Sequence, residues 1–367
     1  WMARTYEVRG QYTPALEWID RGLAILGDRL TPSALELRLL SGLIFSRQGD
    51  YKLASQQALA SLLAAEELDE PAIVARSHNL LGIIDRNRGR YNQAISHFEE
   101  SLSLYREFGN LQGQALAQNS LANAYFDMGM WTEADHNYRQ AGKTFNQLGD
   151  IYNRVIVDNN IGGIALNQGR LDDALQAYRR ALSALEQISG SLWVMGALHL
   201  NLGATHTKRK EIDEALAHLG QSRDLFERAR NRDLLPEMHR RLAEAYLANL
   251  DFARARQEAD RSLAVGEELA VLGEQGLTTN VLGAIAAAEG MREEAIQHFE
   301  RAIDLLKGMG DNYGMACAQL SLAEVKAGRR DNRLRIELLN NCLPVFERLG
   351  AAIELERAQT LLEALKK

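Results

Sequence analysis

The chain has 367 residues, of which 46% are hydrophobic and 25% are charged, and its formal net charge is −7. This composition is typical of a folded globular protein, and no apolar run is long enough to predict a membrane span. The negative charge argues against direct binding to nucleic acid, because that binding depends on a field of positive charge.

Residues that favour helices dominate the composition. Ala, Leu, Glu, Arg and Gln lose little conformational freedom in a helix and are abundant, whereas there are five prolines and 7% aromatic residues. We therefore expect an all-α fold. Cys317 and Cys342 give neither a disulfide framework nor a metal-ligand spacing, which fits a cytoplasmic protein.

A repeat of about forty residues runs through the whole chain. Its clearest copies contain a glycine followed five residues later by an alanine: GQYTPA at 10, GDYKLA at 49, GRYNQA at 89, GMWTEA at 129, GRLDDA at 169 and GMREEA at 290. Two degenerate copies, KEIDEA at 210 and LDFARA at 250, fill the gap, so the interval stays at 39 to 41 residues. The pattern predicts about nine copies of one structural unit.

Each copy contains two helical patterns, which we call helix A and helix B. Helix A precedes the glycine and carries a pair such as Leu81 and Gly82. Helix B follows the glycine and carries the alanine, a bulky residue four positions later and a small residue seven positions later. Because these positions share one helical face, we expect them to pack against helix A. The glycines that end helix B predict left-handed C-caps, and Pro344 predicts a kink in the last helix B.

One such helix pair cannot bury its apolar face alone, so the copies are expected to stack. We predict a single α-solenoid over residues 1–367, with a superhelical concave groove and a solitary capping helix at 351–367. Trp1 falls in the middle of the first helix A, counting back from Gly10. The first helix is therefore expected to be truncated, and the chain to be part of a larger polypeptide.

The pattern resembles the tetratricopeptide repeat (TPR) family. The resemblance rests on segments such as ARSHNLLGIIDRNRGRYNQAISHFEESLSLY, in which Leu81, Gly82, Ala94, Phe98 and Ser101 occupy the family's apolar and small positions. The forty-residue period is similar to the elongated variant of kinesin light chains, spindle-orientation adaptors and bacterial regulators. In this family the A helices line a concave groove that binds peptides, which implies a non-catalytic protein-binding scaffold.

Four asparagines recur at one helix A position, two residues before the apolar residue of the pair: Asn79, Asn119, Asn159 and Asn280. Two residues turn a helix by about 200°, so these amides are expected to point away from the packing between helix A and helix B. The resemblance implies a ladder of carboxamides that binds the backbone of a peptide. In the alternative interpretation, which stays open, the amides bridge adjacent A helices or face water.

Other residues of the same face extend this candidate groove. Asn123, Gly163, Asp127 and Asn167 follow the asparagines by four and eight residues, while Arg240 replaces the asparagine in a later copy. Arg47, Arg76 and Arg86 predict a basic entrance and, weakly, an acidic ligand. Gly163 lies in VDNNIGGIALNQGR, which resembles a phosphate-binding loop until the repeat shows that the stretch is a helix A.

No pattern predicts catalysis or a cofactor. The histidines fall at two recurring positions, with His78, His199 and His239 at one and His97, His218 and His298 at the other, and their spacing shows no convergent metal geometry. The GKT at 142–144 lacks the upstream glycine of a phosphate-binding motif. We therefore expect no enzyme activity, metal or cofactor.

Three hypotheses follow for partners. The leading one is a scaffold that binds a protein or peptide segment in its concave groove. The alternative is the sensing arm of a multidomain regulator, such as a signal-transduction ATPase or a transcription factor, in which the groove holds a small effector or another domain of the same polypeptide. The third is self-association into a homo-oligomer through the truncated end.

Overall fold

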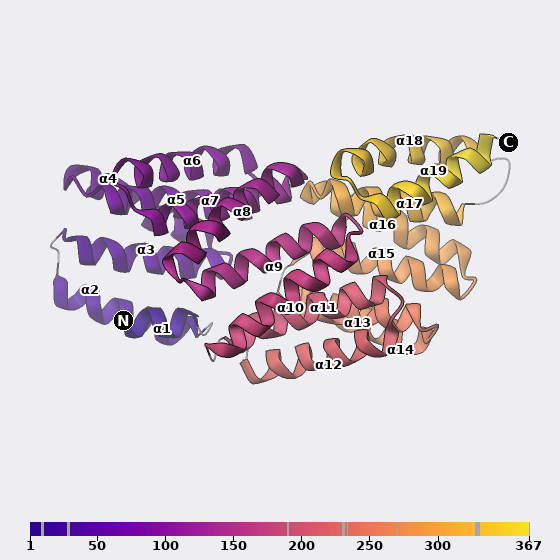
Figure 1. The fold of residues 1–367 in the computed structure, drawn as a ribbon, viewed down its shortest axis with the longest axis horizontal. Coiled ribbons are helices and arrows are strands. Elements are labelled where there is room, and N and C mark those ends of the chain that lie inside the picture. Colours follow the sequence, from indigo (N-terminus) through magenta and orange to yellow (C-terminus); the bar gives the residue numbers. More distant parts are fainter. Residues whose placement is uncertain are drawn as a thin grey trace. The chain divides into compact units, whose positions relative to one another are not determined.

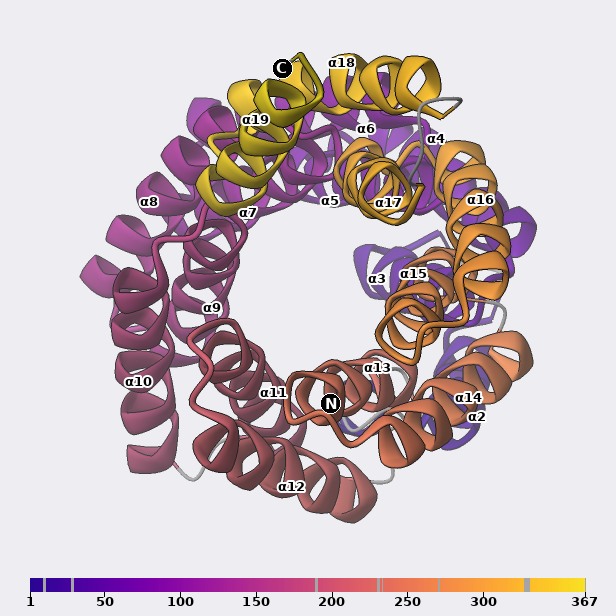
Figure 2. The same cartoon turned by 90° about the vertical axis from the view of Figure 1, so that its right-hand side faces the viewer.

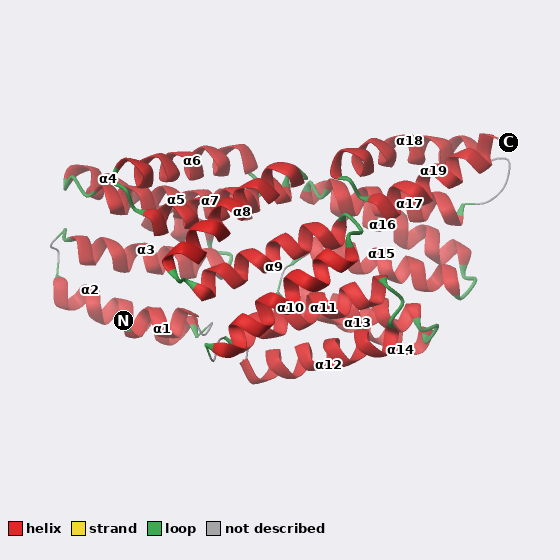
Figure 3. Ribbon diagram, viewed as in Figure 1, coloured by secondary structure: helices red, strands yellow, loops and turns green. Residues whose placement is uncertain are grey.

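The computed structural model describes residues 1–8, 11–27, 30–188, 191–229, 232, 234–269, 271–326 and 331–366. These residues form nineteen α-helices, and none of them lies in a β-strand (Figure 3). The all-α prediction is therefore confirmed. Gly10, which marks the first turn of the repeat pattern, lies outside the described residues.

The helices divide into two compact units, Trp1–Val157 and Asp158–Lys367. The first unit contains α1 (Met2–Val8), α2 (Tyr12–Leu26), α3 (Pro32–Arg47), α4 (Tyr51–Glu67), α5 (Pro71–Asn87), α6 (Tyr91–Glu107), α7 (Leu111–Asp127) and α8 (Trp131–Leu148) (Figure 1). Helix α9 (Ile151–Asn167) begins in the first unit and ends in the second. One continuous solenoid over 1–367 stays a prediction.

The second unit continues the same alternation of helices. It contains α10 (Leu171–Gln187), α11 (Leu192–Lys208), α12 (Ile212–Ala229), α13 (Leu235–Ala248), α14 (Phe252–Glu268), α15 (Leu272–Ala288), α16 (Arg292–Met309), α17 (Asn312–Val325), α18 (Asn332–Leu349) and α19 (Ala352–Lys366). The odd-numbered helices are the predicted A helices and the even-numbered ones are the B helices. Helix α18 continues past Pro344 to Leu349.

The repeat alanines of helix B are among the most deeply buried residues of each pair. Their exposed fraction is 0% in all eight copies: Ala15, Ala54, Ala94, Ala134, Ala174, Ala215, Ala255 and Ala295. The bulky residue one turn later packs on the small residue of helix A. A Cβ atom added to Gly82 would lie 2.5 Å from the Phe98 ring, and one added to Gly162 would lie 2.5 Å from the Tyr178 ring. The predicted packing of helix A on helix B is confirmed.

The turn between helix A and helix B requires a left-handed residue in every well-described copy. Glycine supplies it in the regular copies, with φ between 71° and 81° at Gly49, Gly89, Gly129, Gly169 and Gly290. In the two degenerate copies Lys210 (φ 64°) and Leu250 (φ 59°) adopt this conformation. These residues keep the turn despite the lost glycine, at a steric cost that glycine avoids.

The A helices lie on the inner side of each stack. Consecutive helices pack as pairs, and in addition α3 contacts α5, α5 contacts α7, α11 contacts α13, α13 contacts α15, and α15 contacts α17. In a curved array the elements on the inside approach one another most closely. In the second unit α11, α13, α15 and α17 form the inner layer, and α12, α14, α16 and α18 form the outer layer (Figure 2).

Candidate functional site

The predicted carboxamides of the first unit lie on α5 and α7. Asn79 and Asn119 are half-buried, and their Oδ1 atoms are buried without a hydrogen-bond partner among the described residues. Asn123, one turn further along α7, accepts a hydrogen bond of 2.5 Å from the hydroxyl of Tyr138. The first unit therefore holds two carboxamides with unused hydrogen-bonding capacity and one that is bound to helix B.

The predicted carboxamides of the second unit behave differently from one another. Asn159 bridges adjacent A helices, because its Oδ1 accepts a hydrogen bond of 2.9 Å from Nδ2 of Asn201 on α11. This contact matches the bridging alternative at that position. The Oδ1 of Asn280 is buried without a partner, as in the first unit. Gly163 and Asn167 are half-buried residues of α9.

The three predicted entrance arginines of the first unit all form ion pairs. Arg47 contacts Glu7, Arg76 Nη1 lies 2.6 Å from Glu36 Oε1, and Arg86 Nε lies 2.6 Å from Asp127 Oδ2. Burial alone would lower the pKa of Arg86, but the Asp127 carboxylate raises it, so the guanidinium stays charged. Because each arginine has a carboxylate partner, these side chains add little net positive charge to the face.

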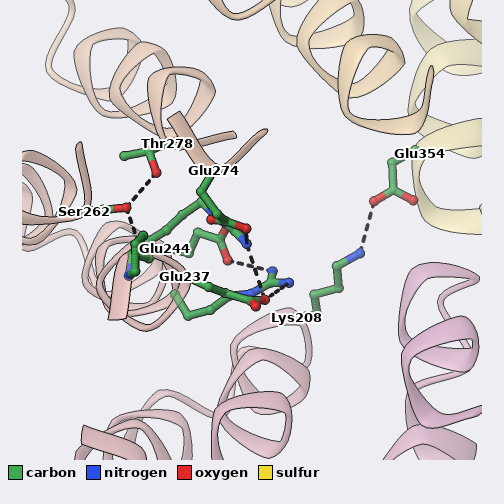
Figure 4. Close-up of polar contacts among 10 residues, drawn as sticks. Lys208, Glu237, Glu244, Ser262, Glu274, Thr278 and Glu354 are labelled. Carbon is green, nitrogen blue, oxygen red and sulfur yellow. Dashed lines mark hydrogen bonds and ion pairs between the residues drawn. The ribbon is translucent and has the colours of Figure 1, made fainter. Parts of the chain in front are cut away.

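Arg240 lies at the centre of a charged network in the second unit. Figure 4 shows the carboxylates of this network, Glu237, Glu244 and Glu274. The Arg240 guanidinium is 2.7 Å from Glu274, 2.8 Å from Glu244 and 3.4 Å from Glu237. The side chain is only 5% exposed. Burial lowers the pKa of Arg240, but the three carboxylates outweigh this effect and raise it well above its usual range. The network holds a buried charge, which requires such partners to be stable.

Arg241 joins the same network from the neighbouring position. It contacts Glu244 at 3.1 Å and Glu237 at 3.3 Å, while its Nε is buried without a hydrogen-bond partner. Burial raises the pKa of Glu274, whereas Arg241 and Arg240 outweigh burial at Glu244 and lower its pKa. Three carboxylates thus surround two guanidinium groups on the inner layer.

A second polar contact joins distant helices of the same unit. Nζ of Lys208 at the end of α11 lies 3.2 Å from Oε1 of Glu354 on α19 (Figure 4). Nearby, Nε2 of Gln168 donates to the carbonyl of Leu349 at 3.1 Å. Helix α19 also packs against α17 and α18. The terminal helix is therefore tied to residues at the start of its own unit.

The recurring histidines form pairs between helix A and helix B. The two recurring positions face each other, so that Nδ1 of His78 lies 3.1 Å from Nδ1 of His97 and Nδ1 of His199 lies 2.9 Å from Nδ1 of His218. In another copy His239 Nδ1 instead lies 2.6 Å from Glu258 Oε2. Within the described ranges, no three His, Cys, Asp or Glu side chains are grouped as metal ligands.

Several polar residues of this face carry no signal in the repeat pattern. Glu237 and Glu274 are the partners of Arg240, and Lys208 and Glu354 connect distant helices, but none belongs to a recurring position. Tyr178 occupies the bulky position of helix B, four residues after Ala174. Asn123 and Gly163 occupy the same position of successive repeats. This change from asparagine to glycine is the sequence signal that could have indicated a difference at the Tyr178 hydroxyl.

A comparison with family models identifies the repeats. The tetratricopeptide repeat model matches residues 73–147 and 153–228. Residues 73–147 and 153–228 are therefore tetratricopeptide repeats. No curated protein sequence matches it, and no helix of the described part is both long and apolar enough to cross a membrane.

Two solved structures are similar in fold to nearly the whole chain. A Rap protein complexed with competence and sporulation factor has a TM-score of 0.67 and 14% identity, covering 100% of this chain and 96% of that chain. The apo form of the quorum sensor NprR from B. thuringiensis has a TM-score of 0.55 and 14% identity, covering 99% and 95%.

Another solved structure with a similar fold is that of a phosphatase. Aspartyl phosphate phosphatase F from Bacillus subtilis has a TM-score of 0.51 and 10% identity, covering 93% of this chain and 95% of that chain. At these identities the similarities establish the TPR fold alone. The fold is compatible with both binding and catalysis, and the side chains of the site determine which of the two occurs.

Proposed function

We propose that this TPR protein is a non-catalytic receptor for an extended peptide or protein segment, which it binds along its A helices. The observation that supports the proposal is the set of unused carboxamides on those helices. The Oδ1 atoms of Asn79, Asn119 and Asn280 are buried and accept no hydrogen bond from any described residue. Buried polar groups without partners are costly, and asparagine is a weak helix former, so a role beyond packing would account for them.

The chemistry of these amides indicates which peptide groups they recognise. Each carboxamide carries an acceptor, the Oδ1 atom without a partner, and a donor, the Nδ2 group. The matching peptide groups are a main-chain N–H for Oδ1 and a main-chain carbonyl for Nδ2. An extended segment offers both groups in a regular series, and recognition of this kind tolerates different ligand sequences.

The charge of the site favours a ligand without a strong net negative charge. Arg47, Arg76 and Arg86 are each paired with a carboxylate, and Arg240 contacts three. An acidic ligand would have to displace these partners or remain unpaired. The acidic ligand suggested by the arginines in the sequence is therefore less well supported than a neutral one.

Neighbouring folds support the same class of function. The Rap structure is described as complexed with competence and sporulation factor, and NprR is described as a quorum sensor. Both cover nearly all of this chain. By that similarity the second candidate is the sensing arm of a regulator, in which the bound segment or another domain shifts an equilibrium between two states.

Selection of a randomised peptide library on the intact chain tests the proposal. Binding of a selected peptide is then measured to two double variants, one with Asn79→Ala and Asn119→Ala, the other with Asn159→Ala and Asn280→Ala. Loss of a hydrogen bond worth about 1 kcal/mol should weaken binding roughly fivefold per amide in the unit that binds. Asn137→Ala is the control, because Asn137 lies on helix B and bonds to the carbonyl of Glu133 in its own helix.

The outcomes separate the candidate sites. A loss in one double variant locates the ligand on that unit, and equal affinity in both double variants and the control would remove the carboxamides from the site. Failure to select any peptide would contradict the peptide-receptor proposal itself. Light scattering over a range of concentrations tests self-association independently.

A further inference from the structure

Two adjacent glycines of α9 have opposite surroundings. A Cβ atom added to Gly162 would lie 2.5 Å from the Tyr178 ring, so packing explains this glycine. A Cβ atom added to Gly163 would meet only the Tyr178 hydroxyl, at 4.0 Å. Packing therefore does not explain Gly163, although glycine weakens a helix interior relative to alanine. The open space at Gly163 ends at a tyrosine hydroxyl.

That hydroxyl lacks the hydrogen bond that its counterpart makes. Tyr178 is fully buried, and its Oη has no hydrogen-bond partner among the residues that the structure describes. One repeat earlier, Tyr138 occupies the same position of helix B and its hydroxyl donates to Asn123 Oδ1 at 2.5 Å. Gly163 stands at the position of Asn123, forty residues later. The missing group is thus a carboxamide oxygen, and the glycine leaves room for one.

The surroundings of the hydroxyl define the charge of the group that it can bind. Burial raises the pKa of Tyr178, Arg241 lowers it and Glu237 raises it, and the net effect is a large increase. The group therefore stays protonated and acts as a donor. Arg240 and Arg241 are already surrounded by Glu237, Glu244 and Glu274. A neutral acceptor suits this environment better than a further carboxylate, which Glu237 would repel.

We propose that the space at Gly163 is a specificity subsite for a carboxamide side chain, Asn or Gln, of the bound segment, whose oxygen accepts a hydrogen bond from Tyr178 Oη. The ligand would supply the group that Asn123 supplies within the chain one repeat earlier. The proposal rests on the peptide-receptor function proposed above and adds the chemistry of one ligand side chain. A main-chain carbonyl offers the same acceptor, and the experiment below separates the two.

The test uses a peptide selected on the intact wild-type chain and its variants with each Asn or Gln replaced by Leu. Binding to wild type, Gly163→Asn and Gly163→Ala is measured by calorimetry. Gly163→Asn places an internal acceptor beside Tyr178, so affinity for the selected peptide should fall at least tenfold. One Leu-substituted peptide should bind wild type at least tenfold more weakly and should lose little further affinity for Gly163→Asn. A main-chain contact predicts instead that no single Leu substitution matters.

Tyr178→Phe provides a second variant that leaves the space unchanged. It should weaken the selected peptide about tenfold and should remove most of the difference between that peptide and its Leu variant. Thermal unfolding of each variant confirms folding, and Gly163→Asn should unfold at the same temperature as wild type or higher. If the peptide binds wild type, Gly163→Asn and Tyr178→Phe equally, the subsite is wrong while the receptor function stands. If no peptide is selected, the receptor function itself fails.

Discussion

Two tyrosines at the same repeat position differ in their hydrogen bonding. In the first unit Tyr138 donates to Asn123 at 2.5 Å, whereas in the second unit the buried Tyr178 hydroxyl faces Gly163 and has no partner in the described part of the chain. Both side chains are buried, with exposed fractions of 2% for Tyr138 and 0% for Tyr178. Packing therefore accounts for an aromatic ring at this repeat position in both units, but it does not account for the Tyr178 hydroxyl.

Substitution of the two adjacent glycines is expected to give the largest difference in stability. Gly162→Ala places a Cβ 2.5 Å from the Tyr178 ring and should destabilise the chain by about 1–3 kcal/mol through overpacking. Gly163→Ala meets only an atom at 4.0 Å and should stabilise the helix by about 1 kcal/mol. Urea unfolding of both variants measures the two effects. Equal destabilisation by both would show that the space at Gly163 is absent.

Asn123→Gly converts the position in the first unit into that of the second. The substitution introduces a helix-interior glycine and removes the acceptor of Tyr138, so it should cost about 2 kcal/mol of unfolding free energy. Asn123→Ala, measured by the same urea titration, isolates the hydrogen bond and should cost about half as much. No loss in either variant would indicate that the Tyr138 contact contributes nothing.

Removal of each tyrosine hydroxyl tests whether the two hydroxyl groups contribute differently to stability. Tyr138→Phe leaves the Asn123 oxygen without its donor and should cost about 1 kcal/mol. Tyr178→Phe removes a buried hydroxyl that has no partner, so stability should be unchanged or slightly higher. Thermal unfolding of the two variants side by side checks the prediction. A similar loss at both positions would mean that Tyr178 has a partner after all.

The histidine pairs predict the smallest effect, which appears at acidic pH. Burial is the main cause that lowers the pKa of His199, to about 4, and it also lowers that of His218. The unfolded chain therefore binds protons first, and stability should fall as the pH drops from about 6.5 towards 4. Partial exposure reduces the effect to fractions of a kcal/mol.

A pair of variants checks this pH dependence. His199→Asn should flatten the decline in unfolding free energy between about pH 6.5 and pH 4, whereas Asn137→Ala on an outer helix should leave it unchanged. An unchanged slope in His199→Asn would assign the decline to other groups. The His78 and His97 pair of the first unit, whose pKa values are lowered chiefly by burial, should behave in the same direction.

The sequence alone was sufficient to predict the helices, because the fold depends on local patterns that recur. The buried alanines, the glycine turns and the pairing of helix A with helix B all follow from residues within one copy. Lys210 and Leu250 show the limit of glycine as a marker, since their turns keep the same left-handed conformation.

The site was less predictable, because its contacts join different copies. The bridge between Asn159 and Asn201 and the contacts of Arg240 with Glu274 cross from one copy to the next. Lys208 and Glu354 are 146 residues apart. Such contacts depend on the curvature of the stack, which the repeat period does not specify. The charges of the predicted arginines were visible in the sequence, but their partners were not.

Hydrogen exchange of the intact chain with and without a selected peptide tests the receptor proposal most directly. We expect the bound peptide to slow exchange in the inner helices, above all in α9 around Gly163 and in α11 and α13. The exchange rates of the outer helices α12, α14 and α16 should be unchanged. We also expect Gly163→Asn to weaken this protection at the same peptide concentration. Protection confined to the outer helices would show that the receptor proposal is wrong.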